Sequence, residues 1–350
     1  MSGGVDSSLT AALLKEQNYD IVGVYMKNWT QDLPGMKCPW ADDLADAKRV
    51  AVQLGIPFEV FDFQKEYKQK VVEYMIDEYE KGHTPNPDIM CNQEIKFKLF
   101  LETALADGAE MIATGHYART EYSENDENHA NLLRAKDENK DQTYFLYRVT
   151  EKALEKTLFP LGDFVSKNEV RKEAEKRGLA TARKKDSQGI CFVGEVGVRD
   201  FLSQFITTES GAIIEQETGC EIGHHDGAIF YTFGQRHGLN LGGGLPFYVV
   251  GKNMAKNEIY VSRNLNNEEF FRDKIELIDT HWINNSPEIL QNYEARFRHR
   301  GQLVDCKFIQ INTKNNSATI ELSQSQRAIA SGQSVVIYRG NVVIGGGIIL

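Results

Sequence analysis

The chain begins MSGGVDSSLTAALL, residues 1–14, where a glycine pair followed by an apolar run predicts a loop that leads into a helix. Glycines let backbone N–H groups crowd around a phosphate without steric cost, and serine hydroxyls add donors. The positive end of the helix dipole lies at the same place. A Walker loop is excluded, because that pattern needs a lysine after its second glycine. The stretch predicts a phosphate-binding loop; the alternative is a glycine turn that only caps a helix.

Length and composition favour a soluble protein of two or three domains. The chain has 350 residues, of which 41% are hydrophobic, enough to form real cores. No apolar run approaches the ~20 residues that a membrane span requires, and no secretory signal pattern is visible. We therefore expect a cytoplasmic protein with no membrane partner.

The cysteines indicate free or catalytic thiols. There are five, an odd number, and none forms a C-x-x-C pair or a zinc-binding spacing. In a reducing compartment such thiols stay unpaired unless they take part in chemistry. For three of them a small buried apolar side chain is the ordinary interpretation; these are Cys38, Cys220 and Cys306.

The other two cysteines stand beside residues that are typical of active-site loops. Cys91 follows Asn86, Pro87 and Asp88, a rigid turn that would direct a carboxylate and a thiol from one loop. In KKDSQGICFVG, residues 184–194, neighbouring lysines could hold the Cys191 thiol as a thiolate. These two positions are candidate catalytic thiols.

The net charge of −10 argues at first against a nucleic-acid partner, but local patches differ from the average. Residues 167–185 carry eight basic residues against three glutamates. In ARFRHR, residues 295–300, arginines recur at every second position, which on a strand would place all three on one face. Either run is an RNA-binding patch or an ordinary solvated surface.

The pattern of apolar residues predicts an α/β domain followed by two β-rich domains. Helical and strand-like segments alternate as far as about residue 200, which predicts a doubly wound parallel sheet with ligands at the carboxyl ends of its strands. Its expected strands include 20–27, 57–63 and 111–118, and its expected helices 41–55, 67–82 and 94–108. Short alternating runs then predict small antiparallel sheets or a barrel. The expected domains are a nucleotide-binding domain 1–200, a small central domain 201–266 and a β-barrel 267–350.

Six motifs occur in the same order as in the tRNA-specific 2-thiouridylases, which the whole chain resembles. They are SGGVDSS (2–8), NPDIMCNQEIKF (86–97), ATGHYAR (113–119), KDQTYFL (140–146), KKDSQGICFVG (184–194) and YTFGQRHGLNLGGG (231–244). The first resembles the PP-loop of the ATP pyrophosphatases, which cleave ATP between its α- and β-phosphates. The resemblance implies that ATP activates the C2 carbonyl of the wobble uridine of tRNA, and that sulfur from a cysteine persulfide replaces the oxygen.

The resemblance also implies roles for individual residues. Cys191 would carry the persulfide, Cys91 would be the nucleophile that closes a disulfide with it, and Asp88 would be a general base beside Asn86 and Pro87 at the target base. ATP, accompanied by Mg²⁺, would be held by Ser2, Gly3, Gly4, Val5, Asp6, Ser7, Met26 and Gly115. The residues that would contact tRNA are Lys140, Asp141, Gln142, Arg298 and His299. At the position of His299 the family commonly has tyrosine. A sulfur-donor protein is the other implied partner.

Two other functions fit part of the sequence. Another PP-loop ligase acting on a small molecule would explain the loop but not the paired cysteines. A tRNA-binding protein without activity would explain the basic runs but not the intact loop. Relatives also carry a first strand before the loop, so we expect a longer native N-terminus, and poor solubility or weak ATP binding for the sequence as written.

Overall fold

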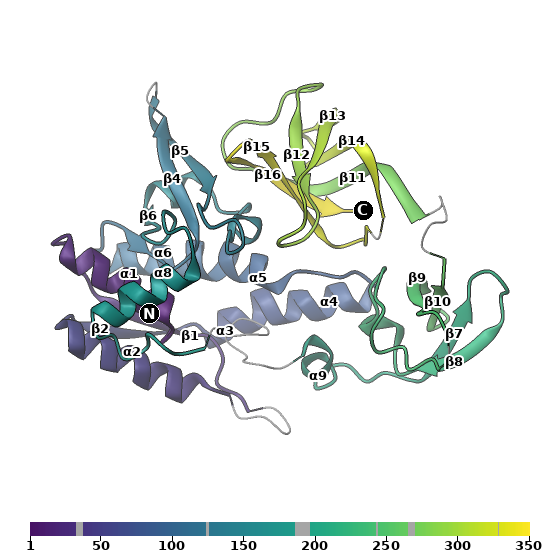
Figure 1. The fold of residues 1–350 in the computed structure, drawn as a ribbon, viewed down its shortest axis with the longest axis horizontal. Coiled ribbons are helices and arrows are strands. Elements are labelled where there is room, and N and C mark those ends of the chain that lie inside the picture. Colours follow the sequence, from purple (N-terminus) through teal and green to yellow (C-terminus); the bar gives the residue numbers. More distant parts are fainter. Residues whose placement is uncertain (33–37, 124–125, 186–196, 243, 265–269, 328) are drawn as a thin grey trace.

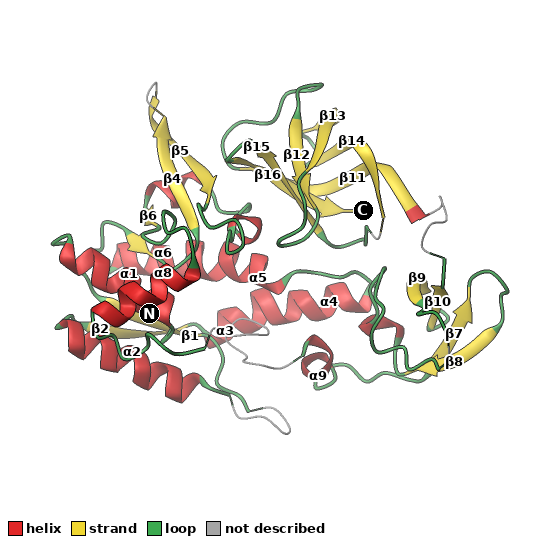
Figure 2. Ribbon diagram, in the orientation of Figure 1, coloured by secondary structure: helices red, strands yellow, loops and turns green. Residues whose placement is uncertain are grey.

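In the computed structural model, the described residues are 1–350 except 33–37, 124–125, 186–196, 243, 265–269 and 328. Figure 1 shows three regions: helices with short strands on the left, a barrel at the upper right, and a small sheet at the lower right. The helix that ends in α4 runs between them, and Figure 2 shows that helices are concentrated in the first region. We call these regions the first part, the barrel and the central sheet.

The first part consists mainly of helices, and its expected helices are confirmed with small shifts of their ends. The second helix ends as the sequence predicts, because Gly55 adopts the left-handed conformation with φ 62°. The helices are α1 (Val5–Glu16), α2 (Trp40–Leu54), α3 (Gln64–Tyr67), η1 (Lys68–Glu73), α4 (Tyr74–Glu80), α5 (Pro87–Met90), η2 (Cys91–Leu99), α6 (Phe100–Ala106), η3 (Thr143–Phe145), α7 (Glu151–Glu155), α8 (Lys167–Lys176) and α9 (Val198–Leu202).

The parallel strands of the first part form two separate pairs among the described residues. β1 (Gly23–Lys27) pairs with β2 (Phe58–Asp62), and β3 (Ile112–Ala113) pairs with β6 (Thr157–Leu158). The parallel α/β prediction is confirmed. The expected strand 111–118 was wrong in length, because the chain leaves the strand after Ala113 and enters the loop that contains Gly115.

A hairpin that the sequence did not predict joins the first part to the barrel. β4 (Ala118–Ser123) pairs with β5 (Asp126–Arg134), and Leu133 of β5 pairs with Val342 of the barrel. The barrel is closed by pairing of its first and last strands, as predicted for this region. Its strands are β11 (Phe271–Trp282), β12 (Tyr293–Arg296), β13 (Val304–Asn312), β14 (Ser317–Arg327), β15 (Ser334–Arg339) and β16 (Val342–Ile349).

The central sheet has the strand order β8-β7-β10-β9. Its elements are β7 (Gly211–Glu215), β8 (Glu221–His225), η4 (Ala228–Phe230), β9 (Tyr248–Asn253) and β10 (Glu258–Ser262). The sheet meets the segment after α4, where the Thr84 and Thr232 hydroxyls lie 3.1 Å apart.

The largest hydrophobic core belongs to the first part and the barrel together. Leu132 of β5 and Tyr147 are fully buried in the same cluster as Val336 and Tyr338 of the barrel. A second cluster fills the barrel, and a third lies under the central sheet. The barrel is therefore packed against the first part through a shared core.

Phe308 fills the centre of the barrel, with its ring edge-to-face against Trp282 and Tyr293 at 5.5 and 5.4 Å. The side chain is 0% exposed. We expect Phe308→Ala to lower the free energy of unfolding by about 3–5 kcal/mol, because it leaves a cavity. The exposed Val52→Ala, at 82% exposure, should change it by less than about 0.5 kcal/mol. Urea unfolding measures both, and equal effects of the two substitutions would contradict this account of the barrel core.

Candidate active site

The N-terminal loop, residues 2–7, is held in a defined shape by its own side chains. Ser7 Oγ accepts a hydrogen bond from the Ser2 backbone N–H at 3.0 Å and lies 3.2 Å from Ser2 Oγ. Gly3 has φ 74°, and a Cβ there would lie 2.3 Å from the Asp43 carbonyl oxygen. Gly4 is the N-cap of α1, and no side chain caps the helix. The first N–H groups of this 12-residue helix thus remain available to an anion.

Two segments distant in sequence pack against the loop and hold it in position. A Cβ at Gly115 would lie 2.9 Å from the backbone N of Ser7, so only glycine allows this close approach. The Asp6 carboxylate accepts hydrogen bonds from Lys167 Nζ at 2.7 Å and from the Tyr117 hydroxyl at 2.9 Å. The structure therefore brings Gly115 and the loop together, whereas the Asp6 side chain is already occupied by protein donors.

The carboxyl end of β1 carries Met26 and, two residues later, a polar residue that sequence reasoning missed. Met26 is half-buried at the edge of the largest core. Asn28 is 1% exposed, and within the described part of the chain its side-chain amide has no hydrogen-bond partner. A polar side chain directly after an apolar strand was the available signal, because ligands bind at such strand ends.

The turn Asn86–Pro87–Asp88, which we call the NPD turn, starts the helix that contains Cys91. The Asn86 side chain caps α5 by accepting from the backbone N–H groups of Asp88 and Ile89 at 3.1 and 3.4 Å. Pro87 follows at the first helical position, where its missing N–H costs nothing. The Asp88 Oδ1 atom is buried and has no partner among the described residues. The sequence thus places a carboxylate with one unpartnered oxygen about one helical turn before the thiol.

Cys91 begins the π-helical stretch η2 and is completely buried. Burial raises the pKa of its thiol to about 12; Lys96 opposes this shift and the Asp88 carboxylate adds to it. In this conformation Cys91 is a neutral thiol. Cys191 lies outside the described residues. Of the three cysteines expected to be ordinary, Cys38 and Cys306 are buried, whereas Cys220 is exposed.

The segment 140–142 lies against the barrel, and its residues differ strongly in exposure. Lys140 is half-buried. Asp141 is 1% exposed and forms a 2.9 Å ion pair with Arg296. Gln142 accepts a hydrogen bond from the Tyr117 backbone N–H at 2.9 Å and so borders the loop of Gly115.

The expectation that all three arginines of residues 295–300 share one strand face was wrong. β12 ends at Arg296, which is buried. The chain then turns, and Arg300 has φ 59°, a conformation that a strand cannot contain. Arg298 is exposed, and His299 is half-buried with its ring centroid 4.6 Å from that of Phe145. Burial lowers the pKa of His299, and nearby Asp141 and Asp88 partly oppose the shift.

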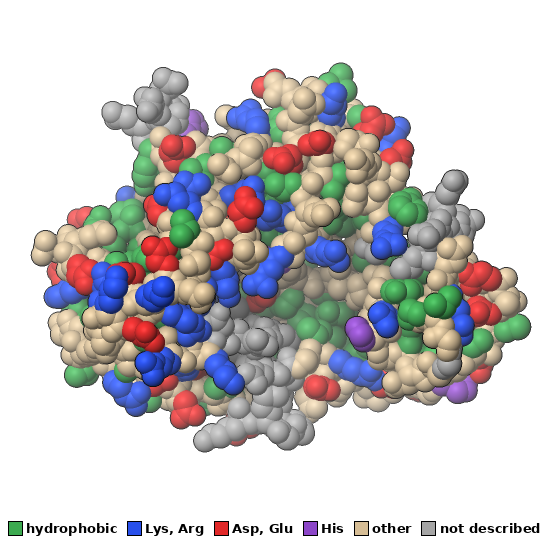
Figure 3. All heavy atoms as spheres, in the orientation of Figure 1, with side chains coloured by type: hydrophobic (Ala, Val, Ile, Leu, Met, Phe, Trp, Pro, Cys, Tyr) green, Lys and Arg blue, Asp and Glu red, His purple; other side chains and the backbone are tan. Residues whose placement is uncertain are grey.

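The basic run 167–185 is largely neutralised by carboxylates of the protein itself. Lys184 bonds to Asp43 and Asp46 at 2.7 Å each, and Arg177 bonds to Glu16 and Glu173 at 2.7 and 2.6 Å. Figure 3 shows blue and red side chains interspersed over the first part. It also shows a hollow between the first part, the barrel and the central sheet, with blue side chains along its upper rim.

His116 is a second polar residue that sequence reasoning missed, and it is half-buried. Its ring lies 5.4 and 6.4 Å from the rings of Phe97 and Phe159, and its Nδ1 lies 2.8 Å from the Thr114 hydroxyl. Burial lowers the pKa of His116 well below its usual value, so the ring is neutral. Its position next to Gly115 was the available signal.

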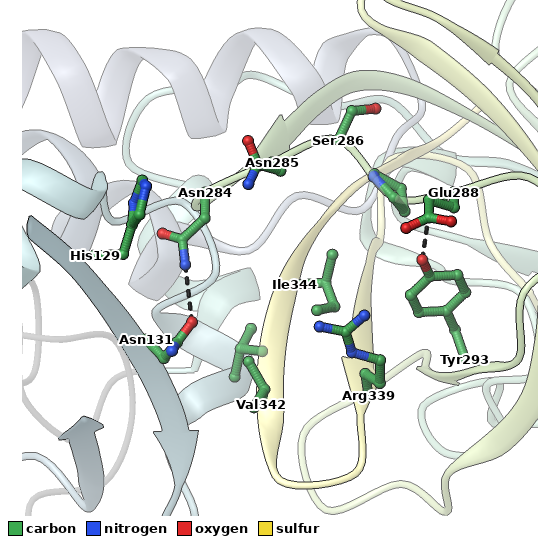
Figure 4. Close-up of a pocket in the computed structure, with 12 residues that line it drawn as sticks. His129, Asn131, Asn284, Asn285, Ser286, Glu288, Tyr293, Arg339, Val342 and Ile344 are labelled. Carbon is green, nitrogen blue, oxygen red and sulfur yellow. Dashed lines mark hydrogen bonds between the residues drawn. The ribbon is translucent and has the colours of Figure 1, made fainter. Parts of the chain in front are cut away.

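A cavity of about 290 Å³ lies apart from these residues, between β5 and the barrel (Figure 4). Asn284 lines it on one side and donates to Asn131 Oδ1 at 2.9 Å. None of the residues predicted from the sequence lines this cavity.

Within the described ranges no group of three or more His, Cys, Asp or Glu side chains is placed to hold a metal ion. Of the helices that the structure describes, none has the length and apolar character needed to cross a membrane.

Comparisons with known proteins cover almost the whole chain. Family models match residues 1–195 (tRNA methyl transferase HUP domain), 199–263 (tRNA methyl transferase PRC-barrel domain) and 272–349 (aminomethyltransferase beta-barrel domain). Proteins named tRNA-specific 2-thiouridylase MnmA are 45% identical over 351 residues in Staphylococcus aureus (strain bovine RF122 / ET3-1) and 46% identical over 347 in Staphylococcus saprophyticus. These alignments cover 100% and 99% of this chain, and 93% and 92% of the relatives. The chain belongs to the tRNA-specific 2-thiouridylase family.

Proposed function

We propose that this protein catalyses ATP-dependent 2-thiolation of the wobble uridine of tRNA. The observation that carries the proposal is the identity of 45% to a 2-thiouridylase over the full chain. The geometry supports it, because an anion-binding loop and a carboxylate–thiol turn occur in one domain. We propose domain limits of 1–200, 201–266 and 267–350, and a cytoplasmic location with access to tRNA.

ATP would lie with its phosphates on the N-terminal loop. We propose that Ser2, Gly3, Gly4, Val5, Asp6 and Ser7 form the phosphate-binding surface, and that Met26 and Gly115 flank the nucleotide. Mg²⁺ would accompany ATP and offset the charge on its phosphates. Because the Asp6 carboxylate is bonded to Lys167 and Tyr117, we propose that the phosphates supply most of the ligands of the ion.

The NPD turn would receive the target uridine. Asn86 and Pro87 would contact the base, while the unpartnered Asp88 Oδ1 could accept a proton from it. Withdrawal of this proton makes the C2 oxygen a better nucleophile towards the α-phosphate of ATP. Pyrophosphate leaves, and AMP remains on the C2 oxygen as a good leaving group.

Sulfur transfer would then use the two cysteines. The Cys91 sulfur attacks the inner sulfur of the Cys191 persulfide, so that a Cys91–Cys191 disulfide forms and the outer sulfur leaves with the bonding electron pair. That sulfur adds to C2 and expels AMP together with the original oxygen. A thiol reductant must reopen the disulfide, and a sulfur-donor protein must rebuild the persulfide, before the next cycle.

Incubating the protein with ATP, tRNA and a sulfur source tests the proposal. Mass spectrometry of the digested tRNA should show 2-thiouridine, and pyrophosphate should appear only when tRNA is present. Pyrophosphate release that depends on a small molecule and not on tRNA would overturn the proposal in favour of another PP-loop ligase.

Gly115→Ala tests the nucleotide site. The added Cβ, 2.9 Å from the Ser7 backbone N, should displace the N-terminal loop and raise the KM for ATP on the order of tenfold to a hundredfold. Gly242→Ala is the matched control, because no atom of the described residues lies within 4 Å of its Cβ position. An unchanged KM for ATP in Gly115→Ala would show that this loop does not bind ATP.

Serine substitutions test the two catalytic thiols. Cys91→Ser and Cys191→Ser should each abolish 2-thiouridine formation, because serine can neither carry a persulfide nor form a disulfide. The dissociation constant for tRNA should stay within about twofold, since neither change removes a phosphate contact. Cys220→Ser, at an exposed position, should retain activity. Thiolation by Cys191→Ser would exclude the persulfide role.

The buried environment of Cys91 predicts how alkylation depends on pH. A pKa raised from 9.0 to about 12 cuts the thiolate fraction at pH 8 from roughly one-tenth to roughly one in ten thousand. Without tRNA, iodoacetamide should modify Cys91 at least about a hundredfold more slowly than the exposed Cys220, and the Cys91 rate should rise with pH between 7 and 9. Peptide mass spectrometry measures both rates, and equal rates at pH 8 would contradict the burial and raised pKa of Cys91.

A further inference from the structure

We propose that Asp141 is a positioning residue that acts through Arg296 and has no contact with tRNA. On this proposal, the Asp141–Arg296 ion pair fixes the position of the turn 297–300 relative to the NPD turn. We call residues 297–300 the barrel turn. The inference rests on the proposed function, because it concerns how the same site receives tRNA. It also changes the role that the family resemblance implied for Asp141.

Both oxygens of Asp141 are occupied by protein groups. Oδ1 accepts from the Thr143 hydroxyl at 2.8 Å and from the backbone N–H groups of Thr143 and Ala135 at 3.3 Å each. Oδ2 accepts from Arg296 Nη1 at 2.9 Å, and Arg134 Nε lies 3.6 Å away. The side chain of Asp141 has 0% exposure, so it offers no surface to a nucleotide.

Arg296 is buried as well, and a second contact, with an aromatic ring, holds its side chain. Its side chain is 6% exposed, and its guanidinium lies 5.1 Å from the ring centroid of Tyr338, itself fully buried in the core. Leaving this cation without its carboxylate would place an uncompensated charge inside the protein. The end of β12 therefore depends on Asp141.

The barrel turn begins directly after Arg296, and three contacts connect it to the helix of Cys91. The Tyr144 hydroxyl donates to the carbonyl oxygens of Phe297 at 3.2 Å and Ser334 at 2.9 Å. The Phe145 ring packs on His299 at 4.6 Å between centroids. Asn92, next to Cys91, donates from Nδ2 to the Phe145 carbonyl at 3.0 Å. The contacts form one path from Asp141, through the barrel turn, to the catalytic helix.

The arrangement has a functional consequence for Arg298. Arg298 is exposed on the barrel turn, two residues after Arg296, and is one of the tRNA contacts that the family resemblance implies. A displacement of the turn by about 1 Å is enough to reduce the rate of a reaction that requires exact alignment by about a hundredfold. Asp141 therefore influences tRNA without touching it.

A double-mutant cycle on Asp141→Asn and Arg296→Gln tests the inference. We expect each single substitution to reduce kcat/KM for tRNA about 30- to 100-fold, because either one displaces the barrel turn. The double variant removes both charges and should be no worse than the single variants. The KM for ATP should remain unchanged, since the N-terminal loop is not part of this path.

Lys140→Gln provides the matched comparison one residue away. Lys140 is a proposed direct contact with tRNA, so its effect should multiply with that of Asp141→Asn. If the effects of Asp141→Asn and Arg296→Gln also multiply, or if Asp141→Asn leaves tRNA kinetics unchanged, the inference is overturned.

Two further measurements test the role of Asp141 without relying on a variant that could misfold or on the proposed activity. Tyr144→Phe removes only a hydroxyl, and its effect on kcat/KM for tRNA should be non-additive with that of Arg296→Gln; multiplied effects would contradict the path. The dissociation constants for tRNA should show the same pattern as kcat/KM. If the wild-type protein binds tRNA but forms no 2-thiouridine, the proposed function fails while the binding cycle still decides the role of Asp141. A wild-type protein that does neither overturns both.

Discussion

The buried ion pair between Asp141 and Arg296 joins the first part to the barrel, next to the hydrophobic core that the two parts share. Burying two charges is costly, and the cost is offset here by the hydrogen bonds that surround Asp141 and by the Tyr338 ring beside Arg296. A buried pair of this kind requires one relative position of its two elements, since any other would leave a charge unpaired. The shared core and the pairing of β5 with β16 join the same two parts of the protein.

This docking explains how one active site can use residues that are far apart in the sequence. In the proposed site, the N-terminal loop and Gly115, which lie against each other, would bind ATP, and the NPD turn with Cys91 would receive the uridine. In the proposed site, the barrel adds Arg298, which is exposed, and His299, which is half-buried. Cys91 is buried and its thiol has a raised pKa, so the proposed sulfur transfer, which uses a thiolate, would need a change in its environment.

Much of this arrangement could be predicted where the local sequence determines the structure. Gly55 ends α2 because glycine readily adopts the left-handed conformation, and the glycine pair before an apolar run gave the N-terminal loop. The hairpin β4–β5 could not be predicted, because its pairing with the barrel joins segments about 200 residues apart. The burial of Asp141 and Arg296 could not be predicted for the same reason. In its local sequence each is typical of a surface charge, and each can be buried because the other neutralises it. For the basic run 167–185 the sequence left two interpretations open, an RNA-binding patch or a solvated surface, because its carboxylate partners on other segments could not be predicted.

If ATP activates the C2 oxygen of a tRNA uridine, that oxygen must leave with AMP. The substrate for this measurement is an anticodon stem–loop that carries oxygen-18 at C2 of the wobble uridine, incubated with the protein, ATP and a sulfur source. We expect 2-thiouridine without oxygen-18 and AMP that has gained the label in its phosphate, in equal amounts. Formation of 2-thiouridine with unlabelled AMP would contradict adenylation of the C2 oxygen.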